Sequence, residues 1–282
     1  MNLKSKEFLN FFFIEAFLFS LTLIAGVFSA KRIQKFSSSQ EIEIPPVSLL
    51  YFILSFAIAT LFIFLLVKFL KRKLLKGKIY KTLFLFTVFL SGLTFFEIWF
   101  GEPLALFLIS LLIFWWVKKP NVLNQDLLMV FGIAGISSIL GLGLKPEPIV
   151  FILILFSIYD FVAVYKTKHM VEMAKEMIEQ KTIFGFVIPQ DIFSFRESLL
   201  NVQPGGKFLV LGGGDVALPL LFSVSLLPSG FLNSIIVAAF SLLGLFISFY
   251  IFTHQKVRRP IPALPPIAFF SIIGFLLIRI LW

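Results

Sequence analysis

Apolar residues in this chain are grouped in long blocks, separated by short turns rich in Pro, Gly and charged residues. Nine such blocks can be delimited: Phe8–Ala30, Val47–Leu70, Thr82–Phe100, Pro103–Val117, Val122–Leu144, Pro148–Tyr165, Lys207–Leu227, Phe231–Thr253 and Ala263–Trp282. Each is taken to cross a hydrocarbon core ~30 Å thick as a helix rising ~1.5 Å per residue, and the shortest, Pro103–Val117, is expected to tilt little. The pattern predicts an all-α polytopic membrane protein with nine transmembrane helices.

One sizeable polar segment interrupts the apolar blocks, between the sixth and the seventh. Over His169–Lys181, Met and other apolar residues recur at spacings of three and four, which predicts an amphipathic helix that continues the sixth span or lies on the membrane surface. The apolar, β-branched Thr182–Ile188 predicts a short strand or a membrane-dipping segment. The predicted organisation is therefore one membrane domain in three parts: a six-span bundle over 1–165, a loop over 166–206 and a three-span bundle over 207–282.

Composition agrees with this class, and charge adds an orientation. The chain is 59% hydrophobic, with a mean hydropathy of +1.00, and its formal net charge is +10. If the N-terminus is cytoplasmic, 20 of the 25 Lys and Arg residues fall on the cytoplasmic side and 5 on the outer side. This bias predicts a cytoplasmic N-terminus and an external C-terminus, and it accounts for the basic balance without a nucleic-acid partner. The chain has no Cys, which excludes disulfides and thiolate chemistry.

Two aspartates lie inside apolar blocks and are the main candidates for chemistry. Asp160 is in the sixth block, and Asp215 follows three glycines in the seventh. An ionised carboxylate inside a bilayer costs several kcal/mol, so such residues are functional candidates by default. Counting residues from the block ends at the helical rise places each about 12 Å from the cytoplasmic edge of the core. Consecutive antiparallel spans can therefore bring the two carboxyl groups face to face.

Paired carboxyl groups at that depth are suited to acid–base chemistry. In a low-dielectric site they share a proton, so that one draws a proton from an attacking water while the other protonates a peptide carbonyl. The glycines before Asp215 remove side-chain bulk and allow a helix or an extended substrate to approach the backbone. The pair by itself equally supports a proton or cation relay in a transporter, or two singly buried structural residues.

Four prolines between Arg259 and Pro266 mark the start of the ninth block. Such a segment does not form a regular helix, and its unpaired backbone groups are available to an extended chain, in the manner of strand addition. A plain helix-start signal is the alternative, for which one or two prolines suffice.

Together these residues resemble a known protease family. Tyr159-Asp160, Gly212-Gly213-Gly214-Asp215 and Pro262-Ala263-Leu264 resemble the YD, GxGD and PAL motifs of the presenilin and signal peptide peptidase family, in the same order. The resemblance implies a catalytic pair, Asp160 and Asp215, with neither a metal nor an organic cofactor. It implies that the remaining motif residues shape the site and bind substrate: Tyr159, Gly212, Gly213, Gly214, Pro262, Ala263 and Leu264.

The family resemblance also implies substrates, location and departures. Members cleave transmembrane segments of other proteins, or signal peptides, within the lipid bilayer, and the predicted orientation is that of presenilin. Gly213 stands where a larger apolar residue is usual, which is expected to loosen the site, and the short 166–206 loop argues against self-cleavage there. The compact size suggests a prokaryotic, archaeal homologue in the cell membrane. Animal presenilins work with accessory subunits, and the sequence indicates none.

Other intramembrane proteases fit less well. The chain has no HExxH motif, which argues against a zinc protease. A rhomboid-type protease needs a histidine within a span, and the two histidines, His169 and His254, lie outside the spans. Prepilin peptidases resemble a pattern with Lys two residues after the aspartate, and that position is Ala217. The alternatives that stay open are a proton-coupled secondary transporter or channel, and an inactive relative that only binds membrane helices.

The remaining acidic residues are weaker candidates. Glu15, about two turns into the first span, is expected to pair with a neighbouring span or to reach toward the interface, and its role stays open. Four others lie near span ends and are interpreted as solvated or helix-end charges: Glu97, Glu102, Asp126 and Glu147.

Overall fold

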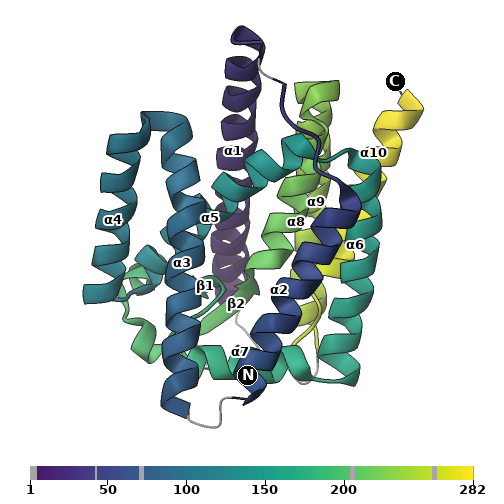
Figure 1. Cartoon of the computed structure of the whole chain (residues 1–282). Helices are drawn as coiled ribbons and strands as arrows, with labels where there is room; N and C mark the ends of the chain where they lie inside the picture. The colour runs from purple at the N-terminus through teal and green to yellow at the C-terminus, as the bar shows by residue number, and fades with distance from the viewer. Residues whose placement is uncertain (1–4, 42, 70–72, 204–206, 256–258, 282) are drawn as a thin grey trace.

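A computed structural model describes residues 5–41, 43–69, 73–203, 207–255 and 259–281. Helices dominate it, and most of them run side by side as a bundle (Figure 1). The described residues form ten α-helices: α1 (Ser5–Ser39), α2 (Leu49–Phe69), α3 (Lys73–Phe100), α4 (Glu102–Lys118), α5 (Val122–Gly143), α6 (Pro146–Phe161), α7 (His169–Glu179), α8 (Gly213–Ser225), α9 (Phe231–Thr253) and α10 (Leu264–Leu281). All except α7 correspond to one of the predicted apolar blocks.

The membrane class is confirmed by the length and composition of the helices. Among the described residues, five helical stretches are long and apolar enough to cross a membrane: Leu9–Ser39, Leu75–Phe100, Val122–Gly143, Pro146–Lys166 and Phe231–Thr253. Many large apolar side chains also remain exposed on the outside of the bundle, as expected where lipid replaces water. The chain is therefore an integral, multi-pass membrane protein.

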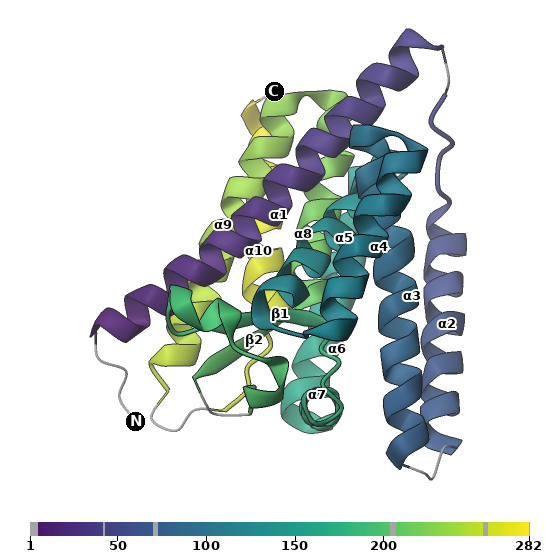
Figure 2. The ribbon, with the colours of Figure 1, turned by 90° about the vertical axis from the view of Figure 1, so that its left-hand side faces the viewer.

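Small residues bring the helices close together at the centre of the bundle. α3 packs on α5 where a side chain on Gly135 would meet the backbone of Ser91, at 2.2 Å from its carbonyl oxygen. α9 packs on α10 where a Cβ on Gly244 would lie 2.5 Å from the Cα of Ile267. Without a hydrophobic driving force between helices in lipid, such close backbone contacts are a main source of association. α1 crosses the bundle diagonally and contacts α5, α8 and α9 (Figure 2).

The seventh apolar block is not a single helix, so the prediction of one continuous helix over Lys207–Leu227 was wrong. Its first residues form strand β2 (Phe208–Gly212), which pairs antiparallel with β1 (Gly185–Pro189), and α8 begins only at Gly213. Three consecutive glycines disfavour a helix, and the apolar residues before them pair with β1 instead. The strand predicted within Thr182–Ile188 is confirmed. Short 3₁₀ turns complete this part of the chain: η2 (Ile192–Arg196), η3 (Leu199–Asn201) and η4 (Leu227–Ser229).

The amphipathic helix predicted after the sixth block is present as α7. α6 runs into one π-helical turn, η1 (Val162–Lys166), and Lys168, with a left-handed φ of 56°, then separates it from α7. α7 is thus a distinct helix and not an extension of α6. It is tied to α3, because the Tyr80 hydroxyl donates to Glu176 at 3.3 Å.

The proline-rich segment is irregular only in its first part. Residues 259–263 are outside any helix, as predicted, whereas Pro265 and Pro266 lie in the first turn of α10. Prolines are tolerated there because the first amides of a helix have no intrahelical acceptor. β1, β2, α7 and the start of α1 lie at one end of the bundle, and the last turn of α10 lies at the other (Figure 2).

Candidate active site

Asp160 is placed in the last turn of α6, facing the protein interior. Its side chain is 7% exposed, and its Oδ2 accepts a hydrogen bond of 3.4 Å from the backbone N–H of Leu264. That amide belongs to the first turn of α10, where backbone donors lack helical partners. The bond joins two of the sequence motifs, which are 104 residues apart in the chain.

Asp215 is placed in the first turn of α8, directly after β2. A helix begins here because Gly212 is its N-cap, and a carboxylate three residues later is favoured by the helix dipole. The carboxyl folds back over the cap: a Cβ on Gly212 would lie 2.9 Å from Asp215 Oδ2. The missing side chain of Gly212 therefore leaves the space that the catalytic candidate occupies.

The structure brings the two aspartates close enough for their charges to interact. The estimate of their depth from the helical rise does not apply to Asp215, since residues 208–212 are extended and rise ~3.3 Å each. The two carboxyl groups lie close together instead because the junction between β2 and α8 places Asp215 next to the end of α6. A low-dielectric site with two adjacent carboxyl groups is suited to sharing one proton between them.

Gly213 and Gly214 have different surroundings. The Gly213 amide donates to the Phe184 carbonyl at 3.1 Å, and a Cβ on Gly213 would lie 2.8 Å from Met129 Cε. The expectation that a glycine at position 213 loosens the site is therefore wrong, because α5 fills the space. Apart from its chain neighbours and its own helix backbone, no atom of the described residues lies within 4 Å of where a Cβ on Gly214 would be, so Gly214 leaves open space beside Asp215.

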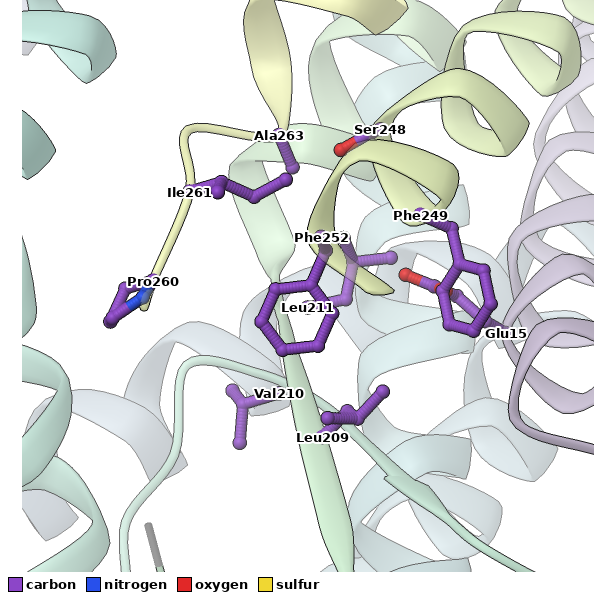
Figure 3. A pocket seen from close by; sticks show the side chains of 10 residues that line it. All are labelled: Glu15, Leu209, Val210, Leu211, Ser248, Phe249, Phe252, Pro260, Ile261 and Ala263. Carbon is purple, nitrogen blue, oxygen red and sulfur yellow. The ribbon is translucent and has the colours of Figure 1, made fainter. Parts of the chain in front are cut away.

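The other motif residues divide into two groups. Pro262 is buried, and Ala263 lines a cavity of about 150 Å³ between β2 and the segment before α10 (Figure 3). Tyr159 is 50% exposed, and its hydroxyl makes no hydrogen bond with the residues that the structure describes. Glu15 of α1 lines the same cavity and interacts electrostatically with Asp215.

Two residues that hold β1 in place were missed by the sequence reasoning. Asp126 is 1% exposed and accepts a hydrogen bond of 2.8 Å from the Val187 N–H, so its interpretation as a solvated charge was wrong. Gln125 donates to the Ile183 carbonyl at 2.6 Å and the Gly185 carbonyl at 3.3 Å. A signal was present in the run of polar residues that opens α5, where Asn121 and Asn124 form a capping box.

The other charged and metal-binding candidates lie away from the aspartates. Glu97 and Glu102 are exposed, as expected, and Glu147 forms a half-exposed ion pair with Arg279. His254 follows the last turn of α9 and is exposed. Within the part of the chain that the structure describes, no three His, Cys, Asp or Glu side chains are grouped to hold a metal ion.

Comparisons with known proteins agree with this geometry. A family model described as "Signal-peptide peptidase, presenilin aspartyl protease" matches residues 13–281. Two solved structures of a presenilin family intramembrane aspartate protease share the fold: one, in space group C222, has a TM-score of 0.60 and 22% identity over 93% of this chain and 94% of its own. The other, in space group P2, has a TM-score of 0.56 and 24% identity over 94% and 97%. A comparison with curated proteins gave no match.

Proposed function

Because this chain belongs to the signal-peptide peptidase and presenilin family of aspartyl proteases, we propose that it hydrolyses peptide bonds within membrane-spanning segments of other proteins, or within signal peptides. The observation that carries the proposal is the meeting of three distant motifs: Asp160 accepts from the Leu264 amide and interacts with Asp215. Asp160 and Asp215 are the proposed catalytic residues.

The proposed mechanism uses one water and the shared proton of the pair. The ionised carboxyl takes a proton from water, whose oxygen attacks the peptide carbonyl carbon, while the protonated carboxyl donates its proton to the carbonyl oxygen. The tetrahedral intermediate then collapses: the C–N bond breaks, and the leaving nitrogen takes the proton that came from water. As the C=O bond reforms, the protonated carbonyl oxygen returns its proton to the carboxyl that donated it. Both carboxyl groups return to their starting states.

The backbone around the pair supports an extended substrate. In the described residues β2 has one partner strand, β1, and its Val210 side chain is 41% exposed. The non-helical residues 259–263 lie across the cavity from β2, so an extended chain between them can pair with free backbone groups. Because Gly214 has no side chain, the scissile bond of the substrate has room to approach Asp215. Pro262, Ala263 and Leu264 are the proposed substrate-positioning segment, and Tyr159 is proposed to contact substrate from the outer face of α6.

The proposed topology has nine transmembrane helices, with the N-terminus in the cytoplasm and the C-terminus outside. It rests on the 20-to-5 distribution of basic residues, and the short loops favour a prokaryotic cell membrane. Because the chain has no Cys, single cysteines report cleanly on orientation. An impermeant maleimide on right-side-out vesicles should label Lys145→Cys and not Phe193→Cys, whose parent residue is 86% exposed at the β1–β2 end. The reverse pattern would invert the topology.

The protease proposal is tested with purified protein in detergent and a single-span substrate. Fragments are identified by mass spectrometry for wild type, Asp160→Asn and Asp215→Asn. A cut inside the span that either substitution abolishes is the expected result. Cleavage that persists in both variants would mean that the two aspartates do not perform it.

A further inference from the structure

The cavity beside the aspartates has one acidic residue among side chains that are mostly apolar. Its walls come from α1, β2, the end of α9 and the segment before α10, and it has a volume of about 150 Å³ (Figure 3). Two lining residues are next in sequence to residues that contact the aspartates. Leu211 precedes Gly212, which borders Asp215, and Ala263 precedes Leu264, whose amide donates to Asp160. A side chain in this cavity therefore belongs to a residue near the scissile bond.

Glu15 is the acidic residue, and its carboxyl group is buried. It is 7% exposed, and its Oε2 is fully buried without a hydrogen bond to any residue that the structure describes. Figure 3 shows its carboxyl end turned past Phe249 toward the other lining residues. A buried carboxyl without a hydrogen bond is costly, so a ligand that supplies the missing partner is favoured at this position.

We propose that this cavity is a subsite for a basic substrate side chain, lysine above all, and that Glu15 selects it. The inference rests on the proposed protease function. A lysine carries an aliphatic stem that suits Leu211 and Phe249 and an ammonium group that suits the carboxylate. A cavity of this volume is known to accommodate a benzene ring, which is comparable in bulk to that stem.

The electrostatics and the topology both favour a cation there. Glu15 interacts with Asp215, and Asp215 with Asp160, so a cation bound there would offset the repulsion that arises when these buried carboxyl groups ionise. In the proposed orientation the cavity lies between the aspartates and the cytoplasmic edge. Membrane substrates carry Lys and Arg next to the cytoplasmic end of their spans, and a strand bound along β2 would deliver such a residue to the cavity.

The test compares lysine with methionine, an unbranched side chain of similar length without the charge. In a single-span substrate, each of the first six positions on the cytoplasmic side of the mapped cut is changed in turn to Lys or Met. We expect wild type to favour Lys at one position by at least tenfold in kcat/KM, mainly through KM, since a site built for a polar group discriminates against an analogue that lacks it. In Glu15→Gln this Lys-to-Met ratio should fall to near one. Glu147→Gln, on the exposed ion pair, is the matched control and should leave the ratio unchanged.

Two results would overturn the subsite. One is a wild type with no Lys preference at any position; the other is a ratio that Glu15→Gln leaves intact, which would make Glu15 a positioning residue for Asp215 alone. Binding of the same peptides to Asp160→Asn separates this inference from the protease proposal. If no substrate is cleaved, the protease proposal fails. A preference for Lys in binding that Glu15→Gln removes would still support the subsite, and the absence of such a preference would contradict it.

Discussion

The contact between α9 and α10 at Gly244 should control the geometry of the catalytic site. A Cβ at this position would lie 2.5 Å from the Cα of Ile267 and 2.7 Å from the carbonyl oxygen of Pro266. Both atoms are backbone, so no side-chain rotation relieves the overlap. Gly244→Ala must therefore move α10 itself. Leu264 lies three residues before Ile267 in the same helix, so its amide, which donates to Asp160, moves as well.

The size of this movement follows from the contact distances. Ordinary contact begins at 3.4 Å, so the helices must separate by 3.4 − 2.5 = 0.9 Å. Overpacking of this kind costs about 1–3 kcal/mol of folding free energy. Catalytic groups tolerate displacements of about 0.5 Å, and a misplacement of about 1 Å costs roughly 100-fold in rate. We therefore expect Gly244→Ala to lower the cleavage rate by about two orders of magnitude.

Gly274→Ala separates the loss of stability from the displacement of the site. It adds the same methyl group to the same helix pair, with the Cβ 2.9 Å from Phe240 Cβ, but ten residues beyond Leu264. Thermal unfolding in detergent should show both variants destabilised, whereas the rate at a temperature where both are folded should fall strongly only in Gly244→Ala. Equal rates in the two folded variants would refute the reasoning.

Three further changes test other contacts. Asp126→Leu leaves a buried β1 amide unpaired and should lower the free energy of unfolding by about 1–3 kcal/mol, whereas Asp126→Asn, which keeps an acceptor, should cost less; equal losses would contradict that role. Gly213→Ala should change the free energy of unfolding by less than about 1 kcal/mol, because the flexible end of Met129 can turn away from the added methyl group; a larger loss would show that Met129 is held in place. Glu147→Gln should change the unfolding free energy by less than about 1 kcal/mol, because its pair with Arg279 is half-exposed; a larger loss would show a stronger pair.

The apolar blocks and the three motifs were visible in the sequence because each depends on local residues. Length and hydropathy identify helices that a membrane must surround, and an aspartate within such a helix is conspicuous. The strand β2 was not visible, since a short apolar run fits a strand and a buried helix equally well. Its partner β1 decides between them, and the register that pairs Gly185 with Gly212 depends on the fold.

Long-range contacts explain the remaining misses. Asp126 near the start of a helix has the pattern of a solvated end charge, and only the Val187 amide, 61 residues away, makes it a buried acceptor. The space around Gly213 depends on Met129 of another helix. The proposed role of Glu15 likewise depends on β2 and α9, which line the same cavity. In each case the residue type was noted correctly, and the neighbour that defines its role lies elsewhere in the chain.

The most direct test of the central claim measures peptide release and proton flux on the same proteoliposomes. Wild type, Asp160→Asn and Asp215→Asn are reconstituted with a single-span substrate, and a pH gradient is imposed. If the aspartates form a hydrolytic pair, wild type releases peptides cut within the span, each substitution stops the release, and proton flux stays at the level of empty liposomes. Proton flux that depends on both aspartates, without peptide release, would contradict the account.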